Sequence, residues 1–232
     1  MKMPLETTST SLWVRLVLYL IAHLTRTKTT RPLVPVVQTP MEALERAAAA
    51  VETADRASVT ARATLDAADS DLDEQVAFFE GELAAHVGRD RKDPLYRRHF
   101  PKGLRAITRK RPAEQLRIVL TFEDTARREL PGVEFATIRL AKIAEARQEV
   151  ERRIPVVQRA LDDLALAVAA ERDARDRLRG AYHVVFAEIV KLFPTRRAKI
   201  NSFFRDPRGA RKPVEVAEPD TTPTPVPAAS AA

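Results

Sequence analysis

The feature that most constrains the fold is a heptad pattern that runs for 60 residues, from Val133 to Leu192. Two sets of positions recur every seven residues, and fifteen of their eighteen residues are apolar. One set is Ala136, Ile143, Val150, Val157, Leu164, Glu171, Leu178, Val185 and Leu192, and the other is Val133, Leu140, Arg147, Ile154, Leu161, Val168, Arg175, Tyr182 and Ile189. Apolar residues at alternating three- and four-residue steps line the face along which one helix packs on another. The pattern therefore predicts a long helix with coiled-coil-like packing.

Two residues inside this pattern could interrupt the helix. The register passes through Pro155 and Gly180 without slipping, which indicates kinks in one helix rather than loops. A break near Gly180 remains an alternative. A helix of this length measures about 90 Å at about 1.5 Å per residue. Any part of its apolar face that the chain itself leaves uncovered would need a protein partner, and we expect either another protein or a second copy in a homodimer.

A second long helix is predicted from Met41 to Gly88. Thr39 and Pro40 precede it, as is typical of a helix start, and Gly88 is a natural C-terminal stop. Alanine recurs at one position of each heptad, which allows a partner helix to approach closely. Its apolar positions are Ala47, Val51, Ala54, Ser58, Ala61, Leu65, Ala68, Leu72, Val76, Phe79, Leu83 and Val87.

Composition agrees with an all-helical chain. Six glycines in 232 residues disfavour glycine-rich phosphate loops, nucleotide-binding βαβ units and tight β-hairpins. We expect an all-α fold, an elongated antiparallel helical bundle with coiled-coil-like heptad packing between disordered N- and C-terminal tails. An apolar segment with a Thr/Pro-rich linker would occupy 1–40, the helical bundle 41–206, and a disordered tail rich in Pro, Ala and Thr 207–232.

Catalytic signatures are missing from the sequence. The chain has no cysteine, and its four histidines (His23, His86, His99 and His183) lie in unrelated contexts. Glu-x-x-His, His-Glu-x-x-His and Gly-x-Ser-x-Gly motifs do not occur. We therefore expect a non-enzymatic protein with no cofactor, no metal and no small-molecule substrate.

Some polar residues lie within or beside the apolar faces of the two long helices. They are Asp55, Arg62 and Asp69, spaced by seven residues, and Glu171 and Arg175, spaced by four. We interpret them as a buried ion-pair layer that fixes the register of the helices, which is the best-attested role of such groups. A ligand or ion site in the bundle core is the alternative.

Two segments are strongly basic, 96–111 and 191–212. In an up-down bundle the two segments should gather at one end, where they could bind the phosphates of nucleic acid or of anionic lipid. Alternatively, they could neutralise the acidic helix, because residues 41–90 carry twelve acids and four bases. The candidate contact residues are Arg97, Arg98, Lys102, Arg105, Arg109, Lys110, Arg111, Arg196, Arg197, Lys199 and Arg205.

The segment Ser11–Leu24 is apolar apart from Arg15 and His23. Its length and its one-sided apolar face predict a helix at a membrane interface rather than a spanning helix. The candidate membrane contacts are Trp13, Leu16, Tyr19 and Leu20. Two alternatives are that this segment docks on the bundle, or that Met41 is the true start of the protein.

The leading functional hypothesis is a helical structural or interaction protein that presents a helix face to a protein partner. The alternatives are a nucleic-acid-binding protein and a peripheral membrane protein. We expect a cytoplasmic location, and peripheral association with a membrane is the alternative. Arginine outnumbers lysine 30 to 9, which is typical of GC-rich bacterial genomes.

Overall fold

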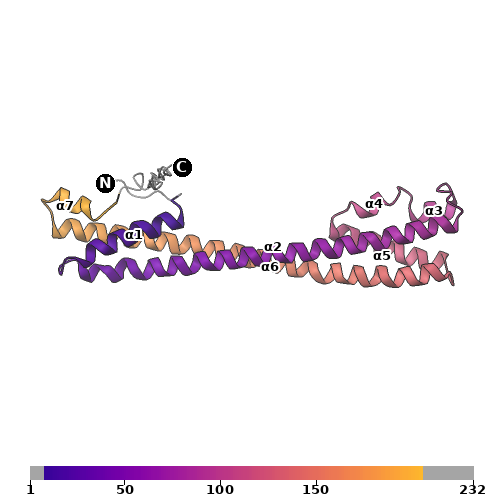
Figure 1. Cartoon of the computed structure of the whole chain (residues 1–232), viewed down its shortest axis with the longest axis horizontal. Helices are drawn as coiled ribbons and strands as arrows, with labels where there is room; N and C mark the ends of the chain where they lie inside the picture. Colours follow the sequence, from indigo (N-terminus) through magenta and orange to yellow (C-terminus); the bar gives the residue numbers. More distant parts are fainter. Residues whose placement is uncertain (1–7, 206–232) are drawn as a thin grey trace, which may run out of the picture. The chain divides into compact units, whose positions relative to one another are not determined.

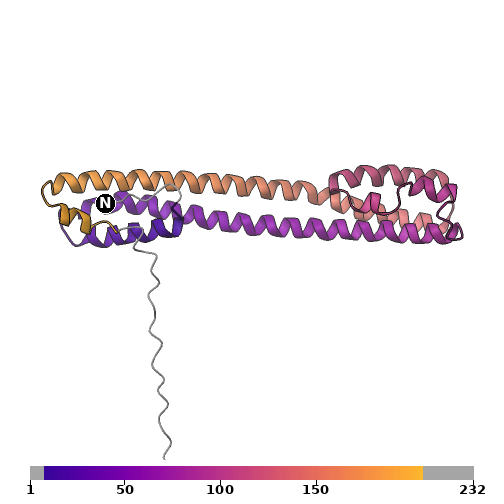
Figure 2. The ribbon, with the colours of Figure 1, turned by 90° about the horizontal axis from the view of Figure 1, so that it is seen from above.

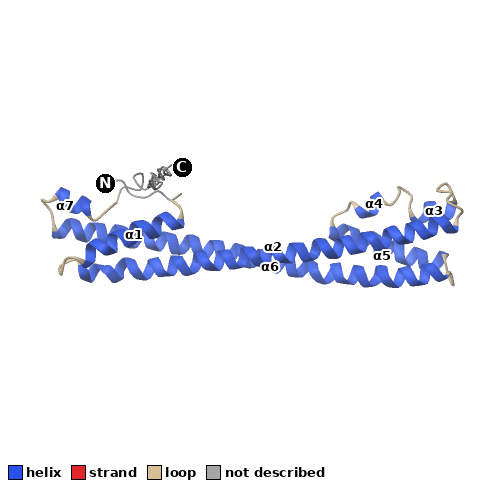
Figure 3. Cartoon of the chain, in the orientation of Figure 1, coloured by secondary structure: helices blue, strands red, loops and turns tan. Residues whose placement is uncertain are grey.

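The structure of this chain is a computed structural model that describes residues 8–205. In this range every regular element is a helix, which confirms the all-α prediction (Figure 3). The predicted tail at 207–232 lies outside the described residues. The elements are α1 (Thr10–Thr25), η1 (Arg31–Leu33), α2 (Val34–His86), α3 (Pro94–His99), α4 (Arg105–Thr108), α5 (Pro112–Glu129), α6 (Glu134–Leu192) and α7 (Arg197–Ser202) (Figure 1).

The chain divides into two compact units. Of the described residues, unit 1 combines 8–39 with 181–205, and unit 2 comprises 40–180. The two long helices, α2 and α6, each contribute residues to both units.

Helix α6 confirms the long heptad pattern. It continues through Pro155 and Gly180 as one helix, as predicted, so the alternative of a break near Gly180 is wrong. Pro155 is exposed, which places its ring on the solvent side of the helix. All the predicted packing positions from Ala136 to Ile189 are buried or half-buried except Val168, which is exposed. The periodicity thus identified the buried face of this helix.

Helix α2 begins at Val34, so the predicted start near Met41 was wrong. Pro40 lies inside the helix, although proline there removes one backbone hydrogen bond. Val37, Met41 and Leu44 recur at helical spacing and are all buried, and this burial offsets the lost bond. The segment predicted as a Thr/Pro-rich linker is therefore helical from Arg31 onward.

In unit 2 the parts of α2 and α6 lie side by side and run antiparallel (Figures 1 and 2). At one end of this pair α5 adds a third helix, and α3 and α4 cover it. Phe79 of α2 lies at the centre of the core, with its ring 4.8 Å from that of Phe122 and 5.8 Å from that of Phe135. This core extends along α2 from Ala68 and along α6 to Val150.

Beyond this core, unit 2 consists of two helices only. We call residues 45–67 of α2 and 151–177 of α6 the two-helix section. The predicted packing positions of α2 are buried or half-buried here as elsewhere in the helix, with Ser58 and Ala61 buried and Ala47, Val51 and Ala54 half-buried. Small side chains at these positions allow close helix approach but leave less of each helix covered.

Unit 1 has a core of its own, to which α1 contributes its apolar face. The ring of Trp13 meets that of Tyr182 edge to face at 5.6 Å, and Tyr182 in turn lies 5.4 Å from Phe204. Thr30 donates a hydrogen bond from Oγ1 to the carbonyl of Leu24 at 2.8 Å, which closes the turn after α1. Among the described residues, no helix is long and apolar enough to cross a bilayer.

Candidate anion-binding site

The α3–α4 segment folds back over α5 because its sequence alternates short helices with turns. Asp93 caps α3 by accepting a hydrogen bond at Oδ1 from the backbone N–H of Leu95 at 2.7 Å. Gly103 has a φ of 76°, which a glycine adopts without strain, and the chain turns there toward α4. Pro112 occupies the first position of α5.

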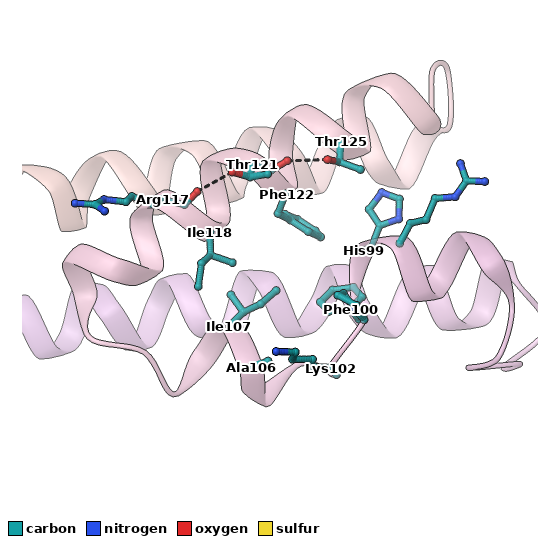
Figure 4. A pocket seen from close by; sticks show the side chains of 13 residues that line it. His99, Phe100, Lys102, Ala106, Ile107, Arg117, Ile118, Thr121, Phe122 and Thr125 are labelled. Carbon is teal, nitrogen blue, oxygen red and sulfur yellow. Dashed lines mark hydrogen bonds between the residues drawn. The ribbon is translucent and has the colours of Figure 1, made fainter.

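This arrangement encloses a pocket of about 400 Å³ between the α3–α4 segment and α5. Its floor is apolar: Phe100, Ile107 and Phe122 are buried, and Ile118 is half-buried (Figure 4). The ring of Phe100 lies 5.5 Å from that of Phe122, so side chains from two elements form one continuous surface.

The charged side chains that line the pocket are Arg98, Lys102 and Arg117. Of the residues that the structure describes, none of those lining the pocket is acidic. Arg98 donates to Glu129 at 3.0 Å, whereas Lys102 and Arg117 form no ion pair with any residue that the structure describes. The pocket therefore has a positive rim around an apolar floor.

One buried polar side chain belongs to the same pocket. The side chain of His99 has no solvent exposure, and its Nδ1 lies 2.9 Å from the carbonyl oxygen of Leu95. Its Nε2 has no hydrogen-bond partner among the described residues. The nearest carboxylate oxygen is Oε2 of Glu129, 3.9 Å from Nδ1.

The predicted contact residues of segment 96–111 are all exposed in unit 2. Arg98 and Lys110 form ion pairs, the latter with Glu114 at 2.7 Å. The aromatic residues of this segment, Tyr96 and Phe100, are buried, so they cannot serve as stacking surfaces for bases. Burial and the hydrogen bond to Glu80 raise the pKa of Tyr96 to about 12.

The second predicted group lies in unit 1. Arg196, Arg197 and Arg205 are exposed, and Lys199 is half-buried with Nζ 4.0 Å from the centre of the Phe193 ring. A cation over an aromatic face is a stabilising contact within the protein. Lys199 is therefore engaged inside its own unit.

The prediction that both basic segments share one end was wrong in its topology. Arg139, near the start of α6, donates to Glu82, near the end of α2, with Nη2 at 2.7 Å from Oε1. The start of α6 therefore lies beside the end of α2, because the α3–α4 segment and α5 reverse the chain between them. Segment 96–111 belongs to unit 2, whereas the described part of segment 191–212 belongs to unit 1.

The predicted ion-pair layer is formed only in part. Asp55 and Arg62 are exposed, because each follows a packing residue, Ala54 or Ala61, by one position and so turns away from the partner helix. Asp69 is half-buried, and burial, with Asp73 and Asp66 nearby, raises its pKa to about 6.

Glu171 and Arg175 form an ion pair, as predicted, but not one between helices. Both are half-buried, and Nη2 of Arg175 donates to Oε1 of Glu171 at 2.9 Å. Because both residues belong to α6, this ion pair is a contact within one helix.

Sequence reasoning missed the most deeply buried charge of unit 2. Glu123 of α5 accepts a hydrogen bond from Nε of Arg147 of α6 at 2.7 Å. The available signal was Arg147 itself, which occupies an apolar position of the heptad pattern. A second missed contact joins α5 to α2, where Gln115 donates to Asp73 at 2.5 Å.

The predicted membrane contacts are not available to lipid. Trp13, Leu16 and Leu20 are buried in the core of unit 1, and Tyr19 is half-buried, with its hydroxyl 3.4 Å from the carbonyl of Ser202. A one-sided apolar helix suits a protein core as well as a membrane interface, which explains the error. The alternative that this segment docks on other helices of the chain is confirmed.

A search of residues 8–205 finds no group of three or more His, Asp or Glu side chains placed to hold a metal ion. Comparison of the chain with protein-family models, with curated proteins and with solved structures gives no match.

Proposed function

We propose that this chain is a non-enzymatic interaction protein that binds a helical protein surface through the two-helix section. The observation that supports this proposal is the outward position of large apolar side chains there. Val59 is 60% exposed and Leu166 is 69% exposed, and Val156 and Val168 are also exposed. Large apolar side chains that a folded chain leaves exposed are available to contact another protein.

A groove between the two helices of this section, which Val156 helps to line, provides room for a partner. It has a volume of about 590 Å³ and contains five alanines, four from α2 and one from α6. Alanine side chains allow the backbone of an incoming helix to approach closely, as in tightly packed helix pairs. The lining residues are Ala50, Thr53, Ala54, Ala57, Ala61, Val156, Arg159, Ala160 and Asp163.

The charges of the two helices favour a second copy of the chain as the partner. Residues 41–74 of α2 carry nine acids and three bases, and residues 152–180 of α6 carry seven bases and five acids. A two-fold axis would place α2 of one copy beside α6 of the other, so that unlike charges meet at the rim of the apolar contact. Such a dimer would give the two-helix section the packing partners that it lacks within one chain.

Sedimentation velocity of the full chain over a range of concentrations tests this proposal. The double substitution Val59→Glu with Leu166→Glu changes exposed positions only, so the folded chain should retain its helix content. We expect the wild-type chain to dimerise and the double variant to dimerise at least about tenfold more weakly. The matched control is Ile138→Glu, an exposed apolar position of α6 outside the two-helix section, and it should dimerise like the wild type. Equal association of all three proteins, or a wild-type monomer throughout, would refute the proposal.

A second candidate function rests on the exposed bases of segment 96–111. Five of these side chains form no ion pair with a described residue: Arg97, Lys102, Arg105, Arg109 and Arg111. Exposed Arg and Lys side chains of this kind bind the phosphates of nucleic acid without recognising its sequence. An electrophoretic shift with duplex DNA tests it, with Arg105→Gln, Arg109→Gln and Arg111→Gln combined. Arg152→Gln, Arg172→Gln and Arg177→Gln combined make the same charge change on exposed residues of α6. No shift at about 50 mM salt, or equal losses in the two variants, would remove this candidate.

A further inference from the structure

We propose that the pocket between the α3–α4 segment and α5 binds a small organic anion. The ligand class is a carboxylate, or a chemically similar acid group, attached to an apolar alkyl or aromatic body. The pocket shares no residue with the two-helix section, so this inference does not rest on the proposed function.

The apolar floor selects the body of the ligand. A volume of about 400 Å³ falls in the range of small-molecule pockets, about 300 to 1,000 Å³. Phe100, Ile107, Ile118 and Phe122 point into this volume from α5 and from the α3–α4 segment (Figure 4). An aromatic or alkyl group placed there leaves water for an apolar surface, whereas inorganic phosphate gains nothing from these contacts.

The charges of the rim select the head group. Lys102 lies beside Ala106 on the α4 side of the pocket, and Arg117 lies on α5 (Figure 4). Arg98 is held by Glu129, so Lys102 and Arg117 supply the positive charge that the described residues do not neutralise by an ion pair. These two cations, in a pocket without a lining carboxylate, attract an anion and repel an organic cation of the same shape.

His99 supports the wall of the pocket behind these side chains. Because a carbonyl oxygen can only accept, the contact of Nδ1 with the Leu95 carbonyl places a ring hydrogen on Nδ1 and fixes the ring. The His99 side chain has no solvent exposure, so it shapes the wall and does not itself contact a ligand in the pocket. The apolar floor and the charged rim therefore define the ligand class.

Calorimetric titration of the full chain tests the ligand class, with 2-naphthoate as the probe. We expect one site per chain, and at least about tenfold weaker binding of 2-naphthylmethylammonium and of inorganic phosphate. The ammonium compound has the same aromatic body with the opposite charge, and phosphate has the charge without the body. No binding of 2-naphthoate, or equal binding of the ammonium compound, would overturn the proposal.

Three variants locate the site. Thr121→Trp places a large ring at an exposed position that lines the pocket, and it should abolish binding of 2-naphthoate. Lys102→Gln with Arg117→Gln should weaken binding at least about tenfold. The matched control is Lys110→Gln with Arg111→Gln, which removes the same charge from exposed residues that do not line the pocket, and it should bind like the wild type. Circular dichroism checks the helix content of each variant, and equal affinity in both double variants would place the ligand elsewhere.

Discussion

Arg147 of α6 donates a hydrogen bond from Nε to Oε1 of Glu123 of α5 at 2.7 Å, inside unit 2. The Glu123 side chain is only 1% exposed, and Arg127 donates to its other oxygen at 2.8 Å. Arg147 replaces an apolar residue in the heptad pattern, and its carboxylate partner lies on a different helix. The pair therefore joins the third helix of unit 2 to α6 at a defined position.

The substitution Glu123→Ala would remove the buried carboxylate of Arg147 and leave its guanidinium only the exposed Glu151, at 3.5 Å. We expect the free energy of unfolding to fall by about 3 kcal/mol, the range measured when one partner of a buried ion pair is removed. Urea unfolding gives this value, and the exposed Glu114→Ala of the same helix is the control. Glu123→Leu combined with Arg147→Leu should recover most of the loss. A Glu123→Ala effect as small as that of Glu114→Ala would contradict this role.

Two adjacent phenylalanines of α2 should differ strongly in their contribution to stability. Phe79 is buried among Phe122, Phe135 and His99, whereas Phe78 is exposed and lies 5.0 Å from the guanidinium carbon of Arg139. Phe79→Ala should lower the free energy of unfolding by about 3 to 5 kcal/mol, because it removes apolar contacts and leaves a cavity. Phe78→Ala should cost less than about 1 kcal/mol, the worth of an exposed cation–π contact. Similar losses for the two variants in urea unfolding would show that the core of unit 2 is packed differently.

The helices could be predicted because periodicity records which face of a chain is buried. This signal carried α6 through Pro155 and Gly180, and it identified the packing residues of α2. It could not locate the start of α2, because the rule that proline precedes a helix competes at Pro40 with the burial of Val37 and Met41. Tertiary burial decided the outcome.

The candidate pocket could not be predicted in the same way. Its floor joins Phe100 and Ile107 to Ile118 and Phe122 across two turns, and no repeating spacing relates these residues. Lys102 appeared among the predicted anion contacts through its charge alone, whereas Arg117 did not because it lies outside the basic run. The sequence also did not predict which end of α2 lies beside the start of α6. Periodicity predicts the buried face of α6, but the reversal of the chain before α5 decides which end of α2 the start of α6 meets.

Stability should depend on pH through Asp69. Its pKa is about 6 in the folded chain, above the ordinary value of 3.8, so the folded state binds the proton more tightly than the unfolded state. The free energy of unfolding should therefore fall as the pH rises from about 4 to about 6, and remain lower above that range.

Asp69→Asn tests this dependence because it removes the titrating group. The variant should be more stable than the wild type at pH 7 by about 1 kcal/mol, once solvent screening of this half-exposed group is allowed for. At pH 3 the two proteins should be equally stable. The exposed Asp55→Asn of the same helix is the control for the change in net charge. A gain at pH 7 that Asp55→Asn reproduces would contradict the assignment to Asp69.

Trp13 is the only tryptophan of the chain, so its fluorescence reports on unit 1 directly. Because the ring is buried against Tyr182, its emission should be blue-shifted relative to the urea-unfolded chain. Addition of anionic phospholipid vesicles should leave the emission unchanged. A further blue shift with vesicles, together with flotation of the chain, would restore the membrane role of α1.

The central claim, that two copies pair through the two-helix section, is tested most directly by the distance between copies. The chain has no cysteine, so Arg62→Cys, at an exposed position of α2 in that section, allows one spin label per chain. Double electron–electron resonance should give a narrow distance distribution between labels. Val59→Glu with Leu166→Glu should abolish it, and Ile138→Glu should preserve it. A signal without dipolar modulation, at concentrations where the proposed dimer would be populated, would contradict the account.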